Sequence, residues 1–85
     1  MPYFLYILES GLDGTYYVGS TRDVDARVAR HNQGGSRYTK SKRPWKVIYY
    51  EKFENKSDAL TRERQIKRRK SREYIETLMR TVLTS

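Results

Sequence analysis

The run from Phe4 to Leu8 limits the fold more than any other feature of this chain. Its residues are apolar at consecutive positions, which predicts a β-strand covered on both faces. The run is far too short to span a membrane, since about 20 residues are needed. A small sheet is therefore expected at the centre of the 85-residue chain, with the remaining elements packed around it.

A hairpin is expected to follow this strand. Residues 10–14 are rich in turn formers, and β-type residues follow them. If Glu9 pairs with Gly14 across a four-residue loop, Tyr6 lies opposite Tyr17 and the two rings share a face. A slip of one residue would place them on opposite faces.

A helix is expected over residues 24–32, with Asp23 as its N-cap and a glycine pair after its end. On a helical wheel His31 falls within roughly 20° of Val24, which marks the buried stripe, and Arg27 sits just beyond it. Both side chains therefore lie on the flank that faces the sheet. Taken alone, the pair fits a functional site, or a solvated arginine beside a part-buried histidine whose hydrogen bonds are satisfied.

The segment from Ser36 to Lys46 is expected to be an ordered loop that leads into a third strand, Trp45 to Phe53. Basic side chains alternate with aromatic rings in this loop, which suits a phosphate backbone with base or sugar stacking. A solvated loop anchored by Trp45 in the core fits the residues equally well. The basic residues are Arg37, Lys40, Lys42, Arg43 and Lys46.

Two further helices are expected. The first runs from Asp58 to about Lys70, with Asn55 or Ser57 as its cap. The second runs from about Arg72 to Leu83. Its apolar stripe is expected to pack into the core and consists of Ile75, Leu78, Met79 and Val82. The chain is thus expected to be one α+β domain, residues 1–85, with about three helices around a three-stranded sheet.

Glu63 is out of place on the first of these helices. It falls between Ala59 and Ile66, which define the inward-facing arc. A carboxylate in a buried stripe must be paired, protonated or bound to a metal. An ion pair with Lys67, four residues on, is one solution, and a metal ion is the other.

The formal charge of +8 comes from 18 Lys and Arg against 10 Asp and Glu. A small domain this basic is expected to attract phosphate backbones without sequence selectivity. No segment has the basic amphipathic pattern of a membrane-surface helix. The chain has no cysteine, which excludes disulfides and thiolate metal sites and agrees with a cytoplasmic protein.

The order of these features resembles the GIY-YIG nuclease superfamily. Its first motif stands here as Phe4-Leu5-Tyr6 and its second as Tyr17-Val18-Gly19. Arg27, His31-Asn32 and Glu63 then follow in the family's order and at its usual spacing. A similarity to the small stand-alone bacterial branch is carried by Tyr38-Thr39, Pro44 and the helical pattern Ala59-Leu60, Arg62-Glu63 and Ile66-Lys67.

The resemblance implies a sheet and helices in the order β-β-α-β-α-α and metal-dependent hydrolysis of DNA phosphodiesters. Glu63 becomes the expected ligand of Mg²⁺ or Mn²⁺, which take oxygen donors. Arg27 is expected to pair with the scissile phosphate. Tyr6 matches the tyrosine proposed as general base, and Tyr17 and His31 match residues that assist proton transfer or position the water. Since a free tyrosine has a pKa of about 10, nearby positive charge would have to lower the pKa of Tyr6.

The chain also departs from the family pattern. Phe4-Leu5 replaces the glycine-containing start of the first motif, which affects packing more than chemistry, and no asparagine follows Asn55. The 85 residues leave no room for a separate DNA-recognition domain, so selectivity would come from the basic segments or from a protein partner. The expected nucleic-acid contacts are Arg37, Tyr38, Lys40, Lys42, Arg43, Lys67, Arg68 and Arg69.

These features predict a DNA endonuclease of low sequence specificity that acts in repair or recombination, with branched and single-stranded DNA among its candidate substrates. The alternative is a nucleic-acid-binding module that keeps the nuclease fold without its chemistry. Nothing in the sequence distinguishes a DNA from an RNA backbone, so RNA stays open as a third choice.

Overall fold

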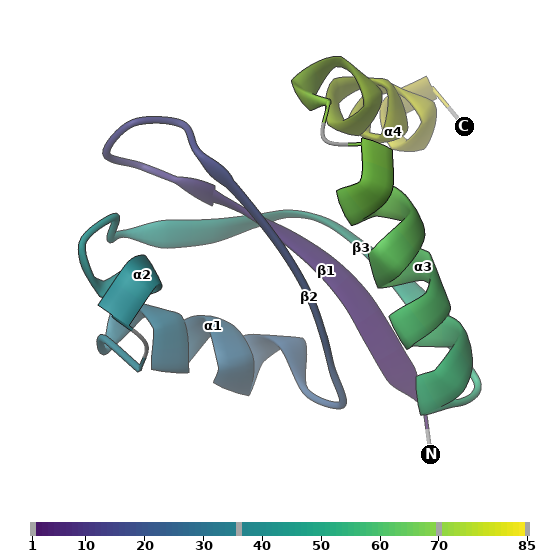
Figure 1. Cartoon of the computed structure of the whole chain (residues 1–85), viewed down its shortest axis with the longest axis horizontal. Helices are drawn as coiled ribbons and strands as arrows, with labels where there is room; N and C mark the ends of the chain where they lie inside the picture. The colour runs from purple at the N-terminus through teal and green to yellow at the C-terminus, as the bar shows by residue number, and fades with distance from the viewer. Residues whose placement is uncertain (1, 36, 70, 85) are drawn as a thin grey trace.

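The computed structural model describes residues 2–35, 37–69 and 71–84, with side chains described as far as Arg80. The elements are β1 (Tyr3–Ser10), β2 (Tyr16–Thr21), α1 (Val24–Asn32), α2 (Arg37–Lys40), β3 (Trp45–Phe53), α3 (Lys56–Arg69) and α4 (Arg72–Thr84), as Figure 1 shows. The predicted order β-β-α-β-α-α is confirmed, with the four-residue helix α2 in addition.

The three strands form one antiparallel sheet in the order β2-β1-β3, so β1 is the central strand. The helices lie on opposite sides of this sheet, α1 and α2 on one and α3 and α4 on the other (Figure 1). Alternate side chains of β1 pack on the two faces of the sheet. Leu5 and Ile7 pack with Ile66 and Ile75 from α3 and α4. On the α1 side, Tyr6 and Leu8 pack with Trp45.

The hairpin register differs from the prediction by two residues. Glu9 pairs with Tyr16 rather than Gly14, so Leu8 lies opposite Tyr17 and Tyr6 lies opposite Gly19. The backbone N–H of Ser10 donates to the carbonyl of Thr15 at 2.8 Å, so the turn lies one residue further along the chain than predicted. Since the shift is an even number of residues, Tyr6 and Tyr17 still share a face, as diagonal rather than direct neighbours.

Helix starts follow local capping. The Asp23 carboxylate accepts a hydrogen bond from the Ala26 backbone N–H at 3.0 Å, which confirms the predicted start of α1. The Asn55 side chain accepts from the Asp58 backbone N–H at 2.9 Å, so the cap of α3 is Asn55 rather than Ser57. Helix α3 therefore starts earlier than predicted and runs to Arg69. Its predicted last residue, Lys70, lies outside the described residues.

The segment predicted as a loop contains a short helix instead. Helix α2 forms because Thr39 is fully buried and the indole N–H of Trp45 donates to its carbonyl oxygen at 2.8 Å. A tertiary contact of this kind leaves no local pattern in the sequence. Ser36, where the loop was predicted to begin, lies outside the described residues.

Helix α4 closes the core on the α3 side, as its stripe predicts. Ile75 is buried, and Leu78 and Met79 pack against the same cluster. The side chain of Val82 lies outside the described residues. None of the helices among the described residues is long and apolar enough to cross a membrane.

Candidate active site

The Tyr6 hydroxyl lies across the backbone of β2 at Gly19. Tyr6 is 1% exposed, and a Cβ added at Gly19 would lie 2.6 Å from its hydroxyl oxygen. The same hydroxyl is 3.1 Å from His31 Nε2. The glycine of the second motif thus makes room for the tyrosine of the first, and α1 supplies the hydrogen-bond partner.

Tyr17 completes an aromatic group on this face. Its ring meets that of His31 edge-on, with centroids 4.8 Å apart, and lies 6.3 Å from the ring of Tyr6. His31 is buried although it belongs to the last turn of α1. Two tyrosines distant from α1 in sequence therefore converge on one imidazole.

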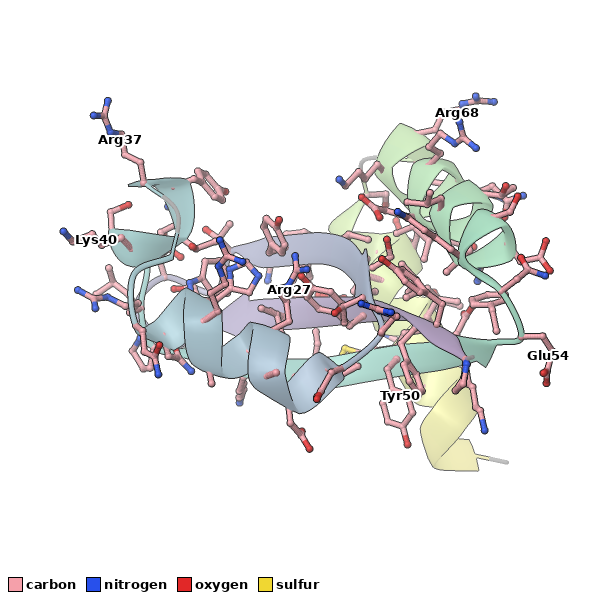
Figure 2. All side chains as sticks on the ribbon, turned by 90° about the horizontal axis from the view of Figure 1, so that it is seen from below. Arg27, Arg37, Lys40, Tyr50, Glu54 and Arg68 are labelled. Carbon is pink, nitrogen blue, oxygen red and sulfur yellow. The ribbon has the colours of Figure 1, made fainter. Side chains whose placement is uncertain are left out.

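Arg27 lies one helical turn before His31 and is half-buried. Its positive charge partly offsets the upward shift in the pKa of Tyr6, and it contributes, after burial, to the lowered pKa of His31. Figure 2 shows Arg27 in the middle of the molecule, between the α2 end that carries Arg37 and the α3 end that carries Arg68. This position suits a cation that binds a phosphate placed over Tyr6.

Glu63 reaches the same edge strand from α3. Its carboxylate accepts a hydrogen bond from the Ser20 hydroxyl at 2.7 Å and an ion pair from the Lys67 ammonium at 2.6 Å. Ser20 follows Gly19 directly and points to the opposite face of β2. After burial and Tyr17, the negative charge of Glu63 also contributes to the raised pKa of Tyr6.

The sequence analysis offered two partners for the Glu63 carboxylate, the Lys67 ammonium and a metal ion. The predicted ion pair with Lys67 is present. The hydrogen bond from Ser20 was missed, although strand alternation after the second motif already places the Ser20 side chain on the α3 side.

Burial is the main cause of the pKa shifts of Tyr6 and His31. It raises the pKa of Tyr6 well above its ordinary value of 10, and the Tyr17 and Glu63 charges add to this effect. Arg27 acts in the opposite direction but does not outweigh burial, so the charge of Arg27 alone does not lower the pKa of Tyr6 below its ordinary value. Burial and the charge of Arg27 lower the pKa of His31. A neutral phenol therefore faces a neutral imidazole at neutral pH.

The side chains around Glu63 could hold a metal ion only if water or substrate supplies most of its ligands. Among the described residues no group of three or more His, Cys, Asp or Glu could enclose an ion. Glu63 offers carboxylate oxygens, its side chain is 17% exposed, and the Lys67 ammonium already lies against it where a cation is favoured. This fits a hard divalent ion such as Mg²⁺ or Mn²⁺ that keeps waters and binds substrate phosphate.

The predicted nucleic-acid contacts divide into two groups. Arg37, Lys40 and Arg68 project from the ends of α2 and α3 on the side of Arg27, while Tyr50 and Glu54 lie on the other side (Figure 2). Tyr38 is 52% exposed beside them. The other predicted contacts also bind within the chain: Lys42 to Asp13, Lys67 to Glu63, Arg43 to the Lys40 carbonyl and Arg69 to the Tyr74 ring.

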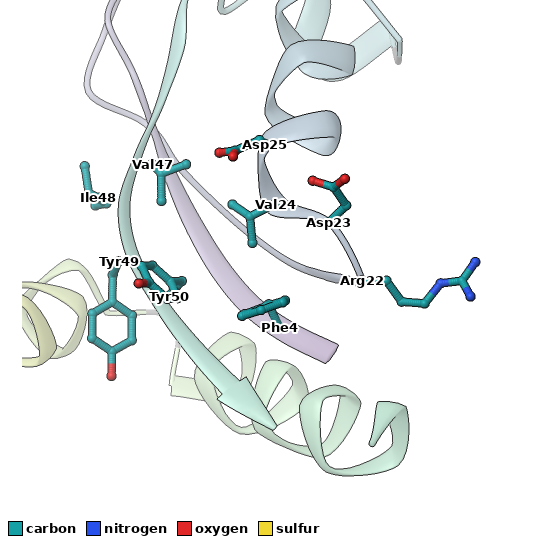
Figure 3. Close-up of a pocket in the computed structure, with 9 residues that line it drawn as sticks. All are labelled: Phe4, Arg22, Asp23, Val24, Asp25, Val47, Ile48, Tyr49 and Tyr50. Atoms are coloured by element: carbon teal, nitrogen blue, oxygen red, sulfur yellow. The ribbon is translucent and has the colours of Figure 1, made fainter. Parts of the chain in front are cut away.

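A surface cavity of about 870 Å³ lies elsewhere among the described residues. It is an open groove between the start of α1 and β3, with Phe4, Val24 and Val47 along its floor and Tyr50 at its side (Figure 3). None of the five predicted catalytic residues lines it.

Comparison with known proteins agrees with this arrangement. The GIY-YIG catalytic domain family matches residues 2–76. The UPF0213 proteins of Staphylococcus aureus strains Mu3 and Mu50 are each 48% identical over 66 residues, which cover 76% of this chain and 79% of theirs. A solution NMR structure of a UPF0213 protein from Bacillus halodurans is 35% identical with a TM-score of 0.59, over 95% of this chain and 85% of that one.

The chain therefore belongs to the GIY-YIG catalytic domain family, a family of nucleases. The resemblance inferred from the motifs is confirmed.

Proposed function

We propose that this protein is a metal-dependent endonuclease that hydrolyses DNA phosphodiester bonds with low sequence specificity. The observation that carries the proposal is the convergence at Gly19 and Ser20 of β2. The Tyr6 hydroxyl lies over this edge on one face, and the Glu63 carboxylate reaches it from the other. A water and a scissile phosphate at this edge would meet groups suited to proton transfer and to charge neutralisation.

Glu63 would hold the divalent ion, with Ser20 orienting its carboxylate. Such an ion, when bound, polarises the phosphoryl oxygens and favours deprotonation of water. Lys67 would leave the carboxylate at that point, because two cations would otherwise compete for the same oxygens.

Tyr6 and His31 would act together as the general base. As the water attacks phosphorus and the P–O bond to the leaving sugar oxygen breaks, the proton of the water would pass to the Tyr6 oxygen while the phenolic proton passes to Nε2 of His31. The leaving oxygen would take its proton from solvent water. The depressed pKa of His31 keeps its imidazole neutral and able to accept this proton. Tyr17 would orient the imidazole through the edge-on ring contact.

Arg27 would bind the non-bridging oxygens of the phosphate and stabilise the charge that develops on them. The exposed cations Arg37, Lys40 and Arg68 would bind flanking phosphates, together with Tyr38 as a stacking surface. Cations that contact only the backbone carry no base specificity, which supports the proposal of low sequence selectivity.

The test is cleavage of linear, nicked and branched DNA with Mg²⁺ or Mn²⁺, with matched RNA substrates alongside. Glu63→Ala and Tyr17→Phe should each lower turnover by at least about 100-fold. The first removes the carboxylate that would hold the metal ion, and the second removes the hydroxyl that would position the attacking water while keeping the ring contact with His31. Activity that survives both substitutions would refute the assignment as a nuclease of this mechanism. Preferential cleavage of RNA would mean that RNA rather than DNA is the substrate.

A second candidate function is a nucleic-acid-binding module without turnover. The ion pair between Lys67 and Glu63 favours it, because it satisfies the carboxylate without any metal. This candidate predicts salt-dependent binding that is unchanged by chelators and by Glu63→Ala, with no cleavage of any substrate.

A further inference from the structure

Trp45 is the only tryptophan of the chain, and it forms the wall behind the candidate active site. It is 3% exposed at the start of β3. Its ring lies 6.1 Å from that of Tyr17 and 6.5 Å from that of His31. The proposed proton acceptor His31 and the ring that orients it, Tyr17, therefore both lie against one buried indole, which has no place in the proposed chemistry.

The Asn32 side chain fixes the backbone of Trp45. Its carboxamide oxygen accepts from the Trp45 N–H at 2.6 Å, and its carboxamide nitrogen donates to the Trp45 carbonyl at 3.1 Å. The amide thus pairs with β3 in the way a neighbouring strand would. Since Asn32 follows His31 directly, these two bonds set the distance between the imidazole and the indole.

The indole also connects this wall to the basic helix α2. Its N–H donates to the carbonyl oxygen of the buried Thr39 at 2.8 Å. Arg43 links α2 to the end of α1, because its guanidinium donates to the Lys40 carbonyl at 2.9 Å and to the Asn32 carbonyl at 3.3 Å. A displacement of α2 therefore acts on the indole and on the end of α1 together.

We propose that Trp45, held by Asn32, is a positioning residue that fixes the rings of Tyr17 and His31 and couples them to helix α2. Neither Trp45 nor Asn32 touches the reacting atoms in this account. The proposal rests on the proposed function for its kinetic consequences, while the coupling itself is a property of the fold. A misplacement of about 1 Å in a catalytic group can cost about 100-fold in rate, so the wall matters even without direct contact.

The kinetic test compares Asn32→Ala with Asn55→Ala, a matched loss of one asparagine that caps α3 away from the wall. At a temperature where both variants are folded, Asn32→Ala should lower kcat by about 10- to 100-fold and leave KM within about twofold. Asn55→Ala should leave both constants near wild type. Equal kcat values for the two variants would overturn the proposal.

Trp45→Phe distinguishes the contribution of the aromatic ring from that of the indole hydrogen bond to Thr39. Phenylalanine keeps an aromatic wall behind Tyr17 and His31 but cannot donate to the Thr39 carbonyl. The loss of kcat should therefore be smaller than for Trp45→Ala. A Phe variant as inactive as the Ala variant would show that ring packing is not what positions the two side chains.

A spectroscopic test does not depend on activity. The chain has one tryptophan and one histidine, so each gives a single side-chain signal in an NMR spectrum. A DNA oligonucleotide should shift the indole N–H signal of the wild-type protein, and Asn32→Ala should shift the His31 ring signals whereas Asn55→Ala should not. If neither shift occurs, the coupling is wrong. If both occur in a protein that cleaves nothing, the coupling stands and the proposed function fails.

Discussion

Gly19 is the residue on which the position of the Tyr6 hydroxyl depends. A Cβ there would lie 2.6 Å from the hydroxyl oxygen and 2.8 Å from Cζ of the ring. Because Tyr6 is buried, its rigid ring has little space into which it can withdraw. The glycine is therefore required by a side chain from the neighbouring strand rather than by its own backbone angles.

We expect Gly19→Ala to displace Tyr6 from His31. Overpacking of this kind should lower the free energy of unfolding by about 1–3 kcal/mol, as urea denaturation would measure. Nuclease turnover should fall by at least about 100-fold at temperatures where the variant is folded. Gly11→Ala is the control, because its methyl group would meet the Pro44 ring away from the site. Wild-type turnover in Gly19→Ala would contradict a catalytic role for Tyr6.

His31 gives the protein a pH dependence with a defined sign. Burial and the charges of Arg27 and Arg30 lower its pKa below the ordinary value of 6.5. The unfolded chain therefore binds this proton at a higher pH than the native state does. The effect is absent well above pH 6.5, and the free energy of unfolding declines as the pH falls from about 6.5 through the pKa of the native state.

We expect His31→Gln to remove this part of the pH dependence, as urea denaturation between pH 5 and 8 (about the range in which histidine titrates) would measure. Turnover of the wild-type protein should fall over the same window, because protonated His31 cannot accept the proton of Tyr6. An NMR titration of the single imidazole that gave a pKa above 6.5 would contradict the expectation.

At the scale of elements, a polar cluster holds α3 in place so that Glu63 faces β2. Arg62 of α3 donates to both carboxylate oxygens of Glu51 on β3, at 2.9 and 3.1 Å, and to the Tyr74 hydroxyl on α4 at 3.1 Å. The Tyr49 hydroxyl also donates to Glu51, and burial raises the pKa of Tyr49 to about 12. One guanidinium thus joins two helices to the sheet.

We expect Arg62→Met to lower the free energy of unfolding by about 1–3 kcal/mol, because it leaves the Glu51 carboxylate without its bidentate partner. Arg64→Met, on the exposed side of the same helix, should change stability by less than about 0.5 kcal/mol. Chemical denaturation of both variants measures the difference. Equal stabilities for the two would mean that α3 is held by apolar packing alone.

At the scale of the whole molecule, exposed positive charge lies on both sides of the candidate site. Arg37 and Lys40 project from one end and Arg68 from the other, with Arg27 between them (Figure 2). The β3 edge, with Tyr50 and Glu54, lies on the other side. Three exposed cations of this chain, which carries a net charge of +8, thus flank the candidate site.

We expect Arg37→Ala, Lys40→Ala and Arg68→Ala each to weaken duplex DNA binding. Each should reduce the slope of log Kobs against log salt concentration by about 0.9, the value for one lost phosphate contact. Fluorescence anisotropy titrations at several salt concentrations measure this slope. Lys52→Ala on β3 is the charge-matched control, and an equal effect of Lys52 would mean that net charge alone drives binding.

Much of the fold could be predicted because it depends on local patterns. The apolar run at β1, the cap at Asp23 and the stripe on α4 each encode an element within a few residues. Periodicity placed Tyr6, Tyr17, Arg27 and His31 around β1 and α1 and placed Glu63 on an apolar arc, and the resemblance to the nuclease superfamily then implied catalytic roles for all five. The membership of the family then rested on their order and spacing.

What the sequence by itself determined is therefore the order β-β-α-β-α-α and the family to which the chain belongs, while the catalytic roles of the five residues stay a prediction. Only the tertiary structure decided the hairpin register, the pairing of Ser20 with Glu63, the indole wall of Trp45 and the upward shift in the pKa of Tyr6. Each of these depends on distances between segments far apart in the chain, or on the summed burial by all neighbours. A sequence pattern with a period of two or 3.6 residues contains no information on such distances or on the summed burial.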